Sequence, residues 1–400
     1  MLKRLSAVIL LAVLATVFSA CGDNGGSHKE YHRIDGTFSN QGITDAQLAE
    51  MVANGDIPRN ATHVHLNGNY ITDVSPLVVL TDMRVLWINN NQITDISQFS
   101  GLTSLTHLRL EQNQLTNISP LSGLTNLEYL NVSVNQISDI SPLSGLINLD
   151  GLLISANLVT DVSPFGGLVN LTFLCINGNQ ISDISPLSGL TNLGRLEMMN
   201  NNIYDISSLS GLVNMRMFGV QDNYISDISS IRELTQLDHL RLEHNQITDI
   251  SPIAGLTNLT AVNFSRNQVI DISALSNLHY LEGLYASGNQ ISDISPISYL
   301  TNLTSLALQD NFIANITPLS GLAAVESMSL DSNNITDITP LRDLTNLAAL
   351  NLERNQITNI SALSGLINLS WLDLTGNPLE RNQIDDLSSA LPDCTIDFHS

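Results

Sequence analysis

Basic residues are scarce in this sequence of 400 residues. Lys and Arg together number 15 against 38 Asp and Glu, which gives a formal net charge of −23 at pH 7. A surface that binds nucleic acid needs clustered positive charge to contact the phosphates. The composition therefore argues against nucleic acid as a partner.

Charged residues of either sign are also few, at 13%, while hydrophobic residues make up 43% of the chain. A disordered chain has the opposite balance, so we expect this chain to fold. The three cysteines, Cys21, Cys175 and Cys394, are too few and too far apart to form a disulfide framework or a CxxC motif.

Long apolar runs are absent as well. Leu5 to Phe18 is apolar but too short to span a bilayer comfortably, and it follows the positively charged start MLKR. The small residues Ser19 and Ala20 then lead to Cys21, so we predict a signal peptide over residues 1–20.

The end of this signal peptide, Phe18-Ser-Ala-Cys21, resembles the bacterial lipobox, although Phe18 stands where that motif usually has Leu. The resemblance implies cleavage before Cys21 and lipid attachment to its sulfur. The protein would then be exported across the cytoplasmic membrane and anchored on its outer side or in the outer membrane. The alternative is an ordinary secreted protein with a leftover thiol. Residues 21–41 are polar and contain glycine, which predicts a flexible tether after the lipidated cysteine.

One asparagine recurs every 22 residues, with no insertion, through most of the remaining chain. Such a period predicts a solenoid in which each repeat is one coil, and neighbouring coils complete a core that one coil cannot bury alone. We call this residue the ladder asparagine; it occurs at Asn69, Asn91, Asn113, Asn135, Asn157, Asn179, Asn201, Asn223, Asn245, Asn267, Asn289, Asn311, Asn333, Asn355 and Asn377.

Each repeat contains a strand signal and a turn signal. The alternation Leu108, Arg109, Leu110, Glu111 is typical of a strand with one buried face. Ser or Thr followed by Pro, as at Ser119-Pro120, starts a helical turn in which we expect the hydroxyl to cap the first N–H groups. The ladder asparagine should point inward and satisfy the backbone of the bend.

A column of acidic residues stands four positions after the ladder asparagine. Stacked carboxylates could attract calcium. The alternative, which we predict, is that each side chain accepts backbone hydrogen bonds in its own turn, because Asn replaces Asp in three repeats. The Asp members are Asp73, Asp95, Asp139, Asp161, Asp183, Asp205, Asp227, Asp249, Asp271, Asp293 and Asp337, and the Asn members are Asn117, Asn315 and Asn359.

The pattern LxxLxLxxNxLxxIxxLxxL over residues 61–378 resembles the leucine-rich repeat, and DISPLSGLTNL resembles the bacterial internalins in particular. The resemblance implies an α/β solenoid, a horseshoe of about 15 coils with parallel concave strands and short 3₁₀ convex turns. It also implies a rigid scaffold that binds protein. The sequence shows no immunoglobulin-like extension, LPxTG signal or Gly-Trp module. We therefore do not expect this protein to share the role of internalins in the invasion of host cells.

Both ends of a solenoid need caps. Thr44 to Gln47 reads as a capping box before Leu48, and Gly55 ends the predicted helix, so residues 42–60 form an N-terminal cap. Residues 379–400 predict a helix and an extended end as the C-terminal cap, with Cys394 as a small core residue.

Catalytic motifs are missing: we find no GxSxG, phosphate loop or HExxH, and we expect neither an enzyme nor a cofactor. His63 and His65 share a strand face, and His107 lies in the column of His63 two coils on. No Cys or carboxylate completes a metal site there, so we predict none.

The strand positions six, four and two before the ladder asparagine vary freely and should face outward. Large apolar residues gather there in the N-terminal half, together with charged residues that could form a polar rim around a binding site. We predict binding of a protein, or alternatively of a glycan, on this concave face. The alternative function is an envelope-structural spacer without a dedicated external ligand. The predicted ligand-binding residues are Val85, Trp87, His107, Arg109, Glu111, Tyr129, Leu153, Phe173, Met199 and Met217.

Overall fold

The computed structural model describes residues 36–399, which form two compact units, one up to Ile203 and one from Tyr204. The predicted signal peptide, Cys21 and most of the predicted tether lie outside the described residues. No helix between residues 36 and 399 is long and apolar enough to cross a membrane.

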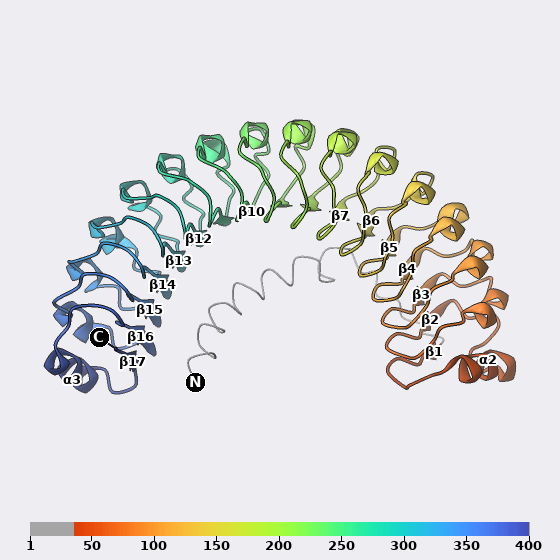
Figure 1. Cartoon of the computed structure of the whole chain (residues 1–400), viewed down its shortest axis with the longest axis horizontal. Coiled ribbons are helices and arrows are strands. Elements are labelled where there is room, and N and C mark those ends of the chain that lie inside the picture. Colours follow the sequence, from red (N-terminus) through yellow and green to blue (C-terminus); the bar gives the residue numbers. More distant parts are fainter. Residues whose placement is uncertain (1–35, 400) are drawn as a thin grey trace. The chain divides into compact units, whose positions relative to one another are not determined.

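The first unit is a stack of coils, each of which contributes one short strand. The strands run parallel, and each pairs with the next one along the chain, in a register that advances by 22 residues from β2 onward. In Figure 1 they line the inner side of the unit, and 3₁₀ helices lie on its outer side. The strands are β1 (Gly36–Thr37), β2 (His63–His65), β3 (Val85–Trp87), β4 (His107–Arg109), β5 (Tyr129–Asn131), β6 (Gly151–Leu153), β7 (Phe173–Cys175) and β8 (Arg195–Glu197).

The helices of the first unit are short except at its N-terminal end. The α-helix α2 (Asp45–Asn54) covers that end. The 3₁₀ helices are η2 (Ser75–Val79), η3 (Ser97–Gly101), η4 (Ser119–Gly123), η5 (Ser141–Leu143), η6 (Ser163–Phe165) and η7 (Ser185–Gly189).

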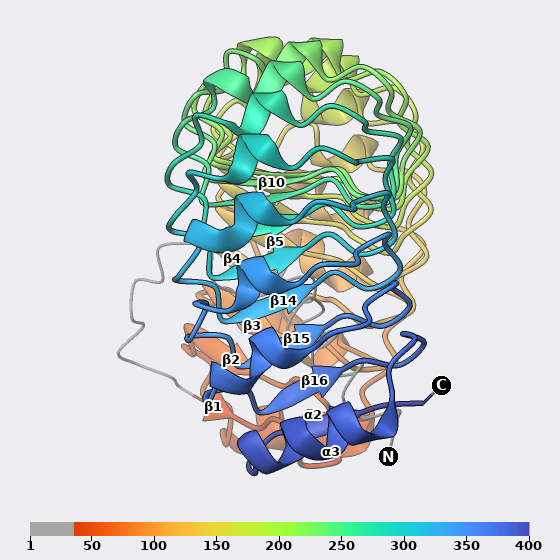
Figure 2. The same ribbon diagram turned by 90° about the vertical axis from the view of Figure 1, so that its left-hand side faces the viewer.

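The second unit repeats this plan and ends in a longer helix. Figure 2 shows β14, β15 and β16 stacked one above the next, with α3 (Arg381–Ala390) beyond them. The strands are β9 (Met217–Gly219), β10 (His239–Arg241), β11 (Ala261–Asn263), β12 (Gly283–Tyr285), β13 (Ser305–Ala307), β14 (Ser327–Ser329), β15 (Ala349–Asn351), β16 (Trp371–Asp373) and β17 (Thr395–Asp397). The 3₁₀ helices are η8 (Ser207–Gly211), η9 (Ser229–Ile231), η10 (Ser251–Gly255), η11 (Ser273–Leu275), η12 (Ser295–Ile297), η13 (Thr317–Gly321), η14 (Thr339–Leu341) and η15 (Ser361–Gly365).

The core of each unit lies between its strands and its 3₁₀ helices. The central residues of β2 to β16 are buried, as are most leucines and isoleucines of the turns; Leu86, Leu108 and Leu121 have no exposed surface. Successive strand residues point to opposite faces, so the residues on either side of Leu86 and Leu108 lie on the non-core face of the sheet. The solenoid predicted from the 22-residue period is confirmed.

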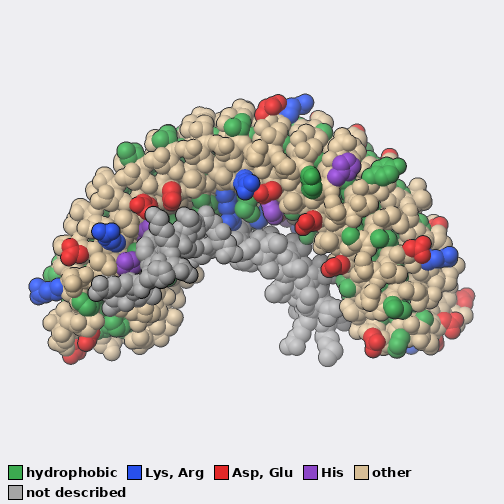
Figure 3. All heavy atoms as spheres, turned by 180° about the vertical axis from the view of Figure 1, so that it is seen from behind, with side chains coloured by type: hydrophobic (Ala, Val, Ile, Leu, Met, Phe, Trp, Pro, Cys, Tyr) green, Lys and Arg blue, Asp and Glu red, His purple; other side chains and the backbone are tan. Residues whose placement is uncertain are grey.

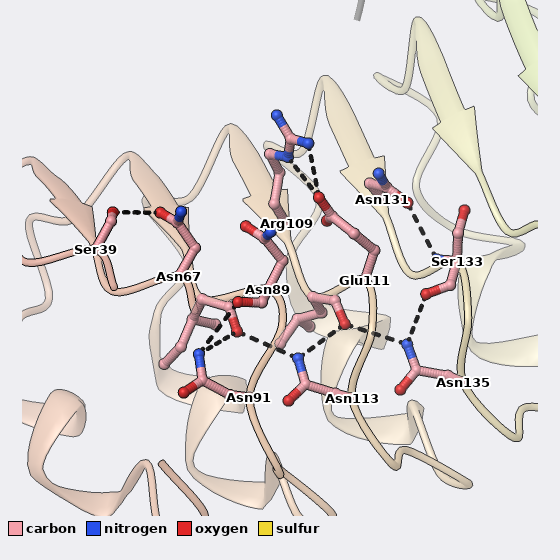
Figure 4. Close-up of polar contacts among 12 residues, drawn as sticks. Ser39, Asn67, Asn89, Asn91, Arg109, Glu111, Asn113, Asn131, Ser133 and Asn135 are labelled. Carbon is pink, nitrogen blue, oxygen red and sulfur yellow. Dashed lines mark hydrogen bonds and ion pairs between the residues drawn. The ribbon is translucent and has the colours of Figure 1, made fainter. Parts of the chain in front are cut away.

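The ladder asparagines point inward and link neighbouring coils, as predicted, and all except the partly buried Asn135 are buried. The Asn91 amide nitrogen donates to the carbonyl oxygens of Leu66 and Ile88, at 3.0 and 3.1 Å, and its oxygen accepts the N–H of Ile71 at 3.0 Å. The amide nitrogens of Asn91, Asn113 and Asn135 line up in Figure 4. One side chain therefore satisfies backbone groups of two consecutive coils, which the closely packed bend would otherwise leave unpaired.

The acidic column acts within its own turns, which confirms the hydrogen-bonding interpretation. Asp95 accepts the N–H of Ser97 at 2.8 Å, and Asn117 accepts that of Ser119 at 2.8 Å. The backbone N–H of Ser207 is the main reason that the pKa of Asp205 lies below its ordinary value. The prediction that the serine hydroxyl caps the helical turn was wrong: before Pro164, the Ser163 hydroxyl donates to Asp161 at 2.9 Å, and the Asp161 carboxylate accepts the Ser163 N–H at 2.8 Å and serves as the cap.

A second asparagine ladder runs through the coils, and the sequence analysis missed it. The side-chain nitrogens of Asn126, Asn148 and Asn170 donate to the carbonyl oxygens of Thr103, Thr125 and Ile147, at 2.8 to 2.9 Å. The same bond recurs in the second unit at Asn258, Asn302, Asn346 and Asn368. Its signal in the sequence was the Asn-Leu pair that recurs at these positions with the same 22-residue period.

The ends of the chain depart in part from the predictions. The capping box is confirmed, because the Gln47 side-chain oxygen accepts the Thr44 N–H at 2.9 Å, and Gly55 ends α2 at φ 85°. The predicted tether extended too far: Gly36–Thr37 is a strand that pairs with β2, although it carries no leucine pattern. The helix and the extended end of the C-terminal cap are confirmed as α3 and β17.

Cys394 is a free cysteine that is only partly buried, so the prediction of a core residue was wrong. It stands in the turn between α3 and β17, where no further coil of the described chain packs beyond it. Partial burial still raises the pKa of its thiol to about 11, because the thiolate is poorly solvated there.

Candidate functional site

The candidate site is the non-core face of the sheet in the first unit. Val85, Trp87, His107, Arg109 and Tyr129 lie on β3, β4 and β5, at positions that flank the buried central leucines. The register places Val85 beside His107 and Trp87 beside Arg109. The predicted residues of neighbouring coils are therefore adjacent in space, about 5 Å apart from strand to strand.

Trp87 is held between two neighbours of the same column. The His65 ring stacks on its indole, with ring centroids 4.0 Å apart and an angle of 2° between the planes. The Arg109 guanidinium lies 5.2 Å from the Trp87 ring centroid, within cation–π range. Arg109 also forms an ion pair with Glu111 at 2.6 Å (Figure 4). These contacts fix the orientation of the indole, because both of its faces have a neighbour.

An apolar cluster lies a few coils further along the same face. Leu153, Phe173 and Cys175 pack together, and Tyr129 packs against them. Gly151 makes room for the tyrosine, because a Cβ atom there would lie 3.0 Å from a Tyr129 ring carbon. The cluster lies on the side of the sheet away from the leucine core, where a spacer would need no apolar group.

A second cation–π pair borders this cluster. The Arg195 guanidinium lies 4.9 Å from the Phe173 ring centroid, and its Nε is 3.3 Å from a Glu197 carboxylate oxygen. Trp87, Arg109 and Glu111 repeat this arrangement of aromatic ring, guanidinium and carboxylate. The charges near each aromatic ring are therefore balanced, and the face offers neutral, amphipathic contacts.

Exposure on this face is lower than the sequence predicted. Val85, Leu153 and Phe173 are 1%, 3% and 6% exposed, and Glu111 is also buried. Part of this burial comes from neighbouring coils, since the Arg195 guanidinium covers one side of Phe173. Half-buried side chains provide the accessible edge of the face; they are Trp87, His107, Arg109, Tyr129 and, in β8's coil, Met199. Met217 is half-buried in β9 of the second unit.

Histidines take part in the face as aromatic neighbours. His107 stacks on Tyr129, with ring centroids 6.0 Å apart. Burial, together with the charges of His63 and Arg109, lowers the pKa of His65, which favours the neutral ring that stacks on Trp87. Among residues 36–399, no group of His, Cys, Asp and Glu is placed to hold a metal ion.

The stack of His65, Trp87 and Arg109 was missed because the sequence was read for apolar content. Its signal was present: each of the three residues follows the last by one 22-residue repeat, so all three occupy one column. A column of His, Trp and Arg on adjacent strands predicts stacking, because directly opposed side chains on one sheet face are neighbours.

Family models match most of the chain. Residues 62–101, 103–145, 147–189, 235–277 and 281–321 match leucine-rich repeats in two copies, and residues 323–379 match a leucine-rich repeat. No curated protein matches the sequence.

Solved structures show the same fold. The internalin InlF of Listeria monocytogenes is 32% identical, with a TM-score of 0.68, over 82% of this chain and 94% of that one. The leucine-rich repeat protein LIC12759 of Leptospira interrogans is 26% identical, with a TM-score of 0.82, over 91% of this chain and 96% of that one. The ectodomain of the Arabidopsis receptor kinase HAESA is 18% identical, with a TM-score of 0.67, over 87% of this chain and 68% of that one, and shares the fold. With its repeats, ladder asparagines and convex turns in place, the chain belongs to the leucine-rich repeat family and is similar to the internalins.

Proposed function

We propose that this protein is an extracytoplasmic lipoprotein that captures a protein ligand on the strand face of its first unit. The observation that carries the proposal is the cluster of Tyr129, Leu153 and Phe173 on the side of the sheet opposite the core. Aromatic residues and Arg are enriched in binding hot spots, and a polar rim commonly surrounds them. Charged side chains of both signs are scattered over the face that Figure 3 shows.

The relatives support a binding role. The HAESA ectodomain was solved in complex with a peptide hormone, and leucine-rich repeats are rigid scaffolds with extended binding surfaces. We therefore propose a protein-interaction scaffold and no catalytic activity. A glycan ligand and a spacer without a ligand are the alternatives that the next experiment separates.

We expect Trp87→Ala and Tyr129→Ala each to weaken ligand capture by about 1 kcal/mol or more, a loss of at least roughly fivefold. The tagged full-length protein would be used as bait on extracts from its native environment, and captured protein measured by quantitative mass spectrometry. Ser305→Ala and Ser327→Ala, on β13 and β14, are the matched controls and should change nothing. The melting temperature should stay within a few degrees, because neither aromatic side chain belongs to the leucine core.

Three other outcomes of the capture experiment would point to a different site, a different ligand or a different function. Equal capture by the aromatic variants and the serine variants would move the site away from this face. Capture that disappears on glycosidase treatment of the extract would identify a glycan. The absence of any specifically captured partner would favour the spacer.

The proposed anchor is the lipid on Cys21, after cleavage of a signal peptide over residues 1–20. We propose the further boundaries 42–60 and 379–400 for the caps and 61–378 for the repeats, with the tether ending before the strand at Gly36–Thr37. In cells labelled with a fatty-acid probe, the wild-type protein should carry the label and fractionate with membranes, while Cys21→Ala should do neither. Equal labelling of the two proteins would remove the anchor from the proposal.

A further inference from the structure

A polar groove runs across the first five coils of the first unit, separate from the strand face. Its volume is about 930 Å³, at the upper end of the range for ligand sites. It is bordered by two rows of side chains, nine and seven positions before the ladder asparagine, and so follows the rim where β2 to β6 begin. Its lining contains amides, hydroxyls and charged groups but no aromatic side chain.

Two acidic side chains lie together at one end of the groove. Glu128 and Asp150 occupy the same row on adjacent coils, which places the two carboxylates about 5 Å apart from coil to coil. Neither carboxylate has an ion pair or a hydrogen bond within residues 36–399. Burial in the groove raises the pKa of Asp150, and Glu128 raises it further. Like charges directly opposite one another on neighbouring strands are destabilising, so this end of the groove favours a cation.

The second unit shows that the repeat does not require this pair. Its acidic residues in the same row, Asp238, Glu282 and Glu326, are separated by the threonines Thr260 and Thr304. Asp238 also has a partner, because His239 Nδ1 lies 2.7 Å from its carboxylate. Adjacent, uncompensated carboxylates are thus a feature of the groove and not of the fold.

The opposite charge lies at the other end of the groove. Arg84 stands in the same row, two coils from Glu128 and three from Asp150, or about 10 to 15 Å away. Asp82 lies in the second row of the same coil and forms no ion pair with Arg84 in the described chain. An extended chain of three to five residues spans about 10 to 17 Å between its ends.

Neutral hydrogen-bonding groups fill the space between the two ends. Ser104, Thr106 and Asn126 line this stretch. The Asn126 nitrogen is engaged with the Thr103 carbonyl, which leaves its side-chain oxygen as an acceptor for a ligand N–H. Hydroxyl and amide side chains can donate to or accept from a peptide backbone, while the lack of an aromatic platform is unfavourable for a sugar.

We propose that this groove binds a short, extended peptide with free ends, whose ammonium group lies at Glu128 and Asp150 and whose carboxylate lies at Arg84. The peptide lies along the rim of the first unit, so its binding is independent of ligand capture on the strand face. A linear polyamine shares the ammonium group but lacks the carboxylate that Arg84 requires.

Isothermal titration calorimetry of the full-length protein at low ionic strength tests this site, with tetra-alanine as the probe. Tetra-alanine should bind saturably, and N-acetylation or C-amidation should each raise Kd by at least about fivefold, the upper scale of a partly exposed ion pair. Asp150→Asn should cause a similar loss for the free peptide. Arg84→Gln should weaken free tetra-alanine but not its C-amide, since the lost contact involves only the carboxylate.

Matched controls come from the same row of the second unit. Asp238→Asn and Arg216→Gln change the net charge equally and should leave Kd unaltered, as should Tyr129→Ala on the strand face. Absence of saturable binding, or equal losses in the control variants, would overturn the proposal. Spermidine binding that matches or exceeds tetra-alanine and is insensitive to Arg84→Gln would replace the peptide with a polyamine.

Discussion

Replacing Asn201 with Leu should lower the free energy of unfolding by about 3 kcal/mol. Asn201 is 5% exposed; its oxygen accepts the Ile181 N–H at 3.1 Å, and its nitrogen donates to the Ile176 and Met198 carbonyls at 3.0 and 3.1 Å. Leucine has a similar size but leaves the buried Ile181 N–H without its acceptor, and it removes one donor from the Ile176 carbonyl, which keeps its bond from the Asn179 nitrogen at 3.1 Å. A buried unpaired polar group costs about 1 to 3 kcal/mol, and the lost donor bonds add to this cost.

Urea denaturation, followed by circular dichroism, measures this loss. The neighbouring Asn202→Leu is the matched control: Asn202 is exposed, so its replacement should change the free energy by no more than about 0.5 kcal/mol. Asn201→Asp, which keeps the acceptor and loses the donors, should fall between the two. Equal stability of Asn201→Leu and Asn202→Leu would show that the ladder is not what joins the coils.

The fold was predictable because every coil buries the same leucine positions in the same way. Leu108 and its equivalents recur without an insertion, so one strand register predicts all the others, and the buried ladder asparagine follows from the need to satisfy each bend. The prediction failed just before the first repeat, where a short strand had been assigned to the flexible tether. Gly36–Thr37 pairs with β2 through backbone groups alone, and no side-chain pattern marks such a strand.

The site was less predictable than the fold. The alternation of strand residues placed Trp87, Tyr129 and Phe173 on the correct face, but not their contacts, because those depend on which side chains coincide in neighbouring coils. The groove at Glu128 and Asp150 was missed for the same reason. A single carboxylate in one repeat is a common surface group. It repels its neighbour, and so favours a bound cation, only when the next repeat has a carboxylate at the same position.

The repeat pattern also did not predict the backbone strain at the residue before each ladder asparagine. The residue before each ladder asparagine adopts a left-handed conformation, which suits Gly178 and Asn200 but also occurs at Val134, with φ 54°. A β-branched residue is disfavoured there. The surrounding ladder imposes this geometry on the bend whatever the side chain, so a pattern of residue types does not reveal it.

The stability of the second unit should depend on pH through Asp331. Burial raises the pKa of this carboxyl from its ordinary value of 3.8 to about 7, and the nearby carboxylates of Asp310, Glu353 and Asp373 contribute to the rise. The folded state therefore holds a proton that the unfolded state releases. Its stabilising effect is complete below about pH 4 and is lost as the pH rises through 7.

Asp331→Asn should therefore stabilise the protein at pH 8 by about 2 kcal/mol and have little effect at pH 4. The shift in pKa corresponds to an upper limit of about 4 kcal/mol, at about 1.4 kcal/mol per unit, and solvent screening at this partly exposed side chain lowers it. Denaturation curves at pH 4, 6 and 8 measure the difference. Asp343→Asn, an exposed change of equal charge, is the control and should show no such pH dependence. A stability gain for Asp331→Asn that is equal at pH 4 and pH 8 would show that folding does not raise the pKa of Asp331, and that the gain has a cause other than its buried charge.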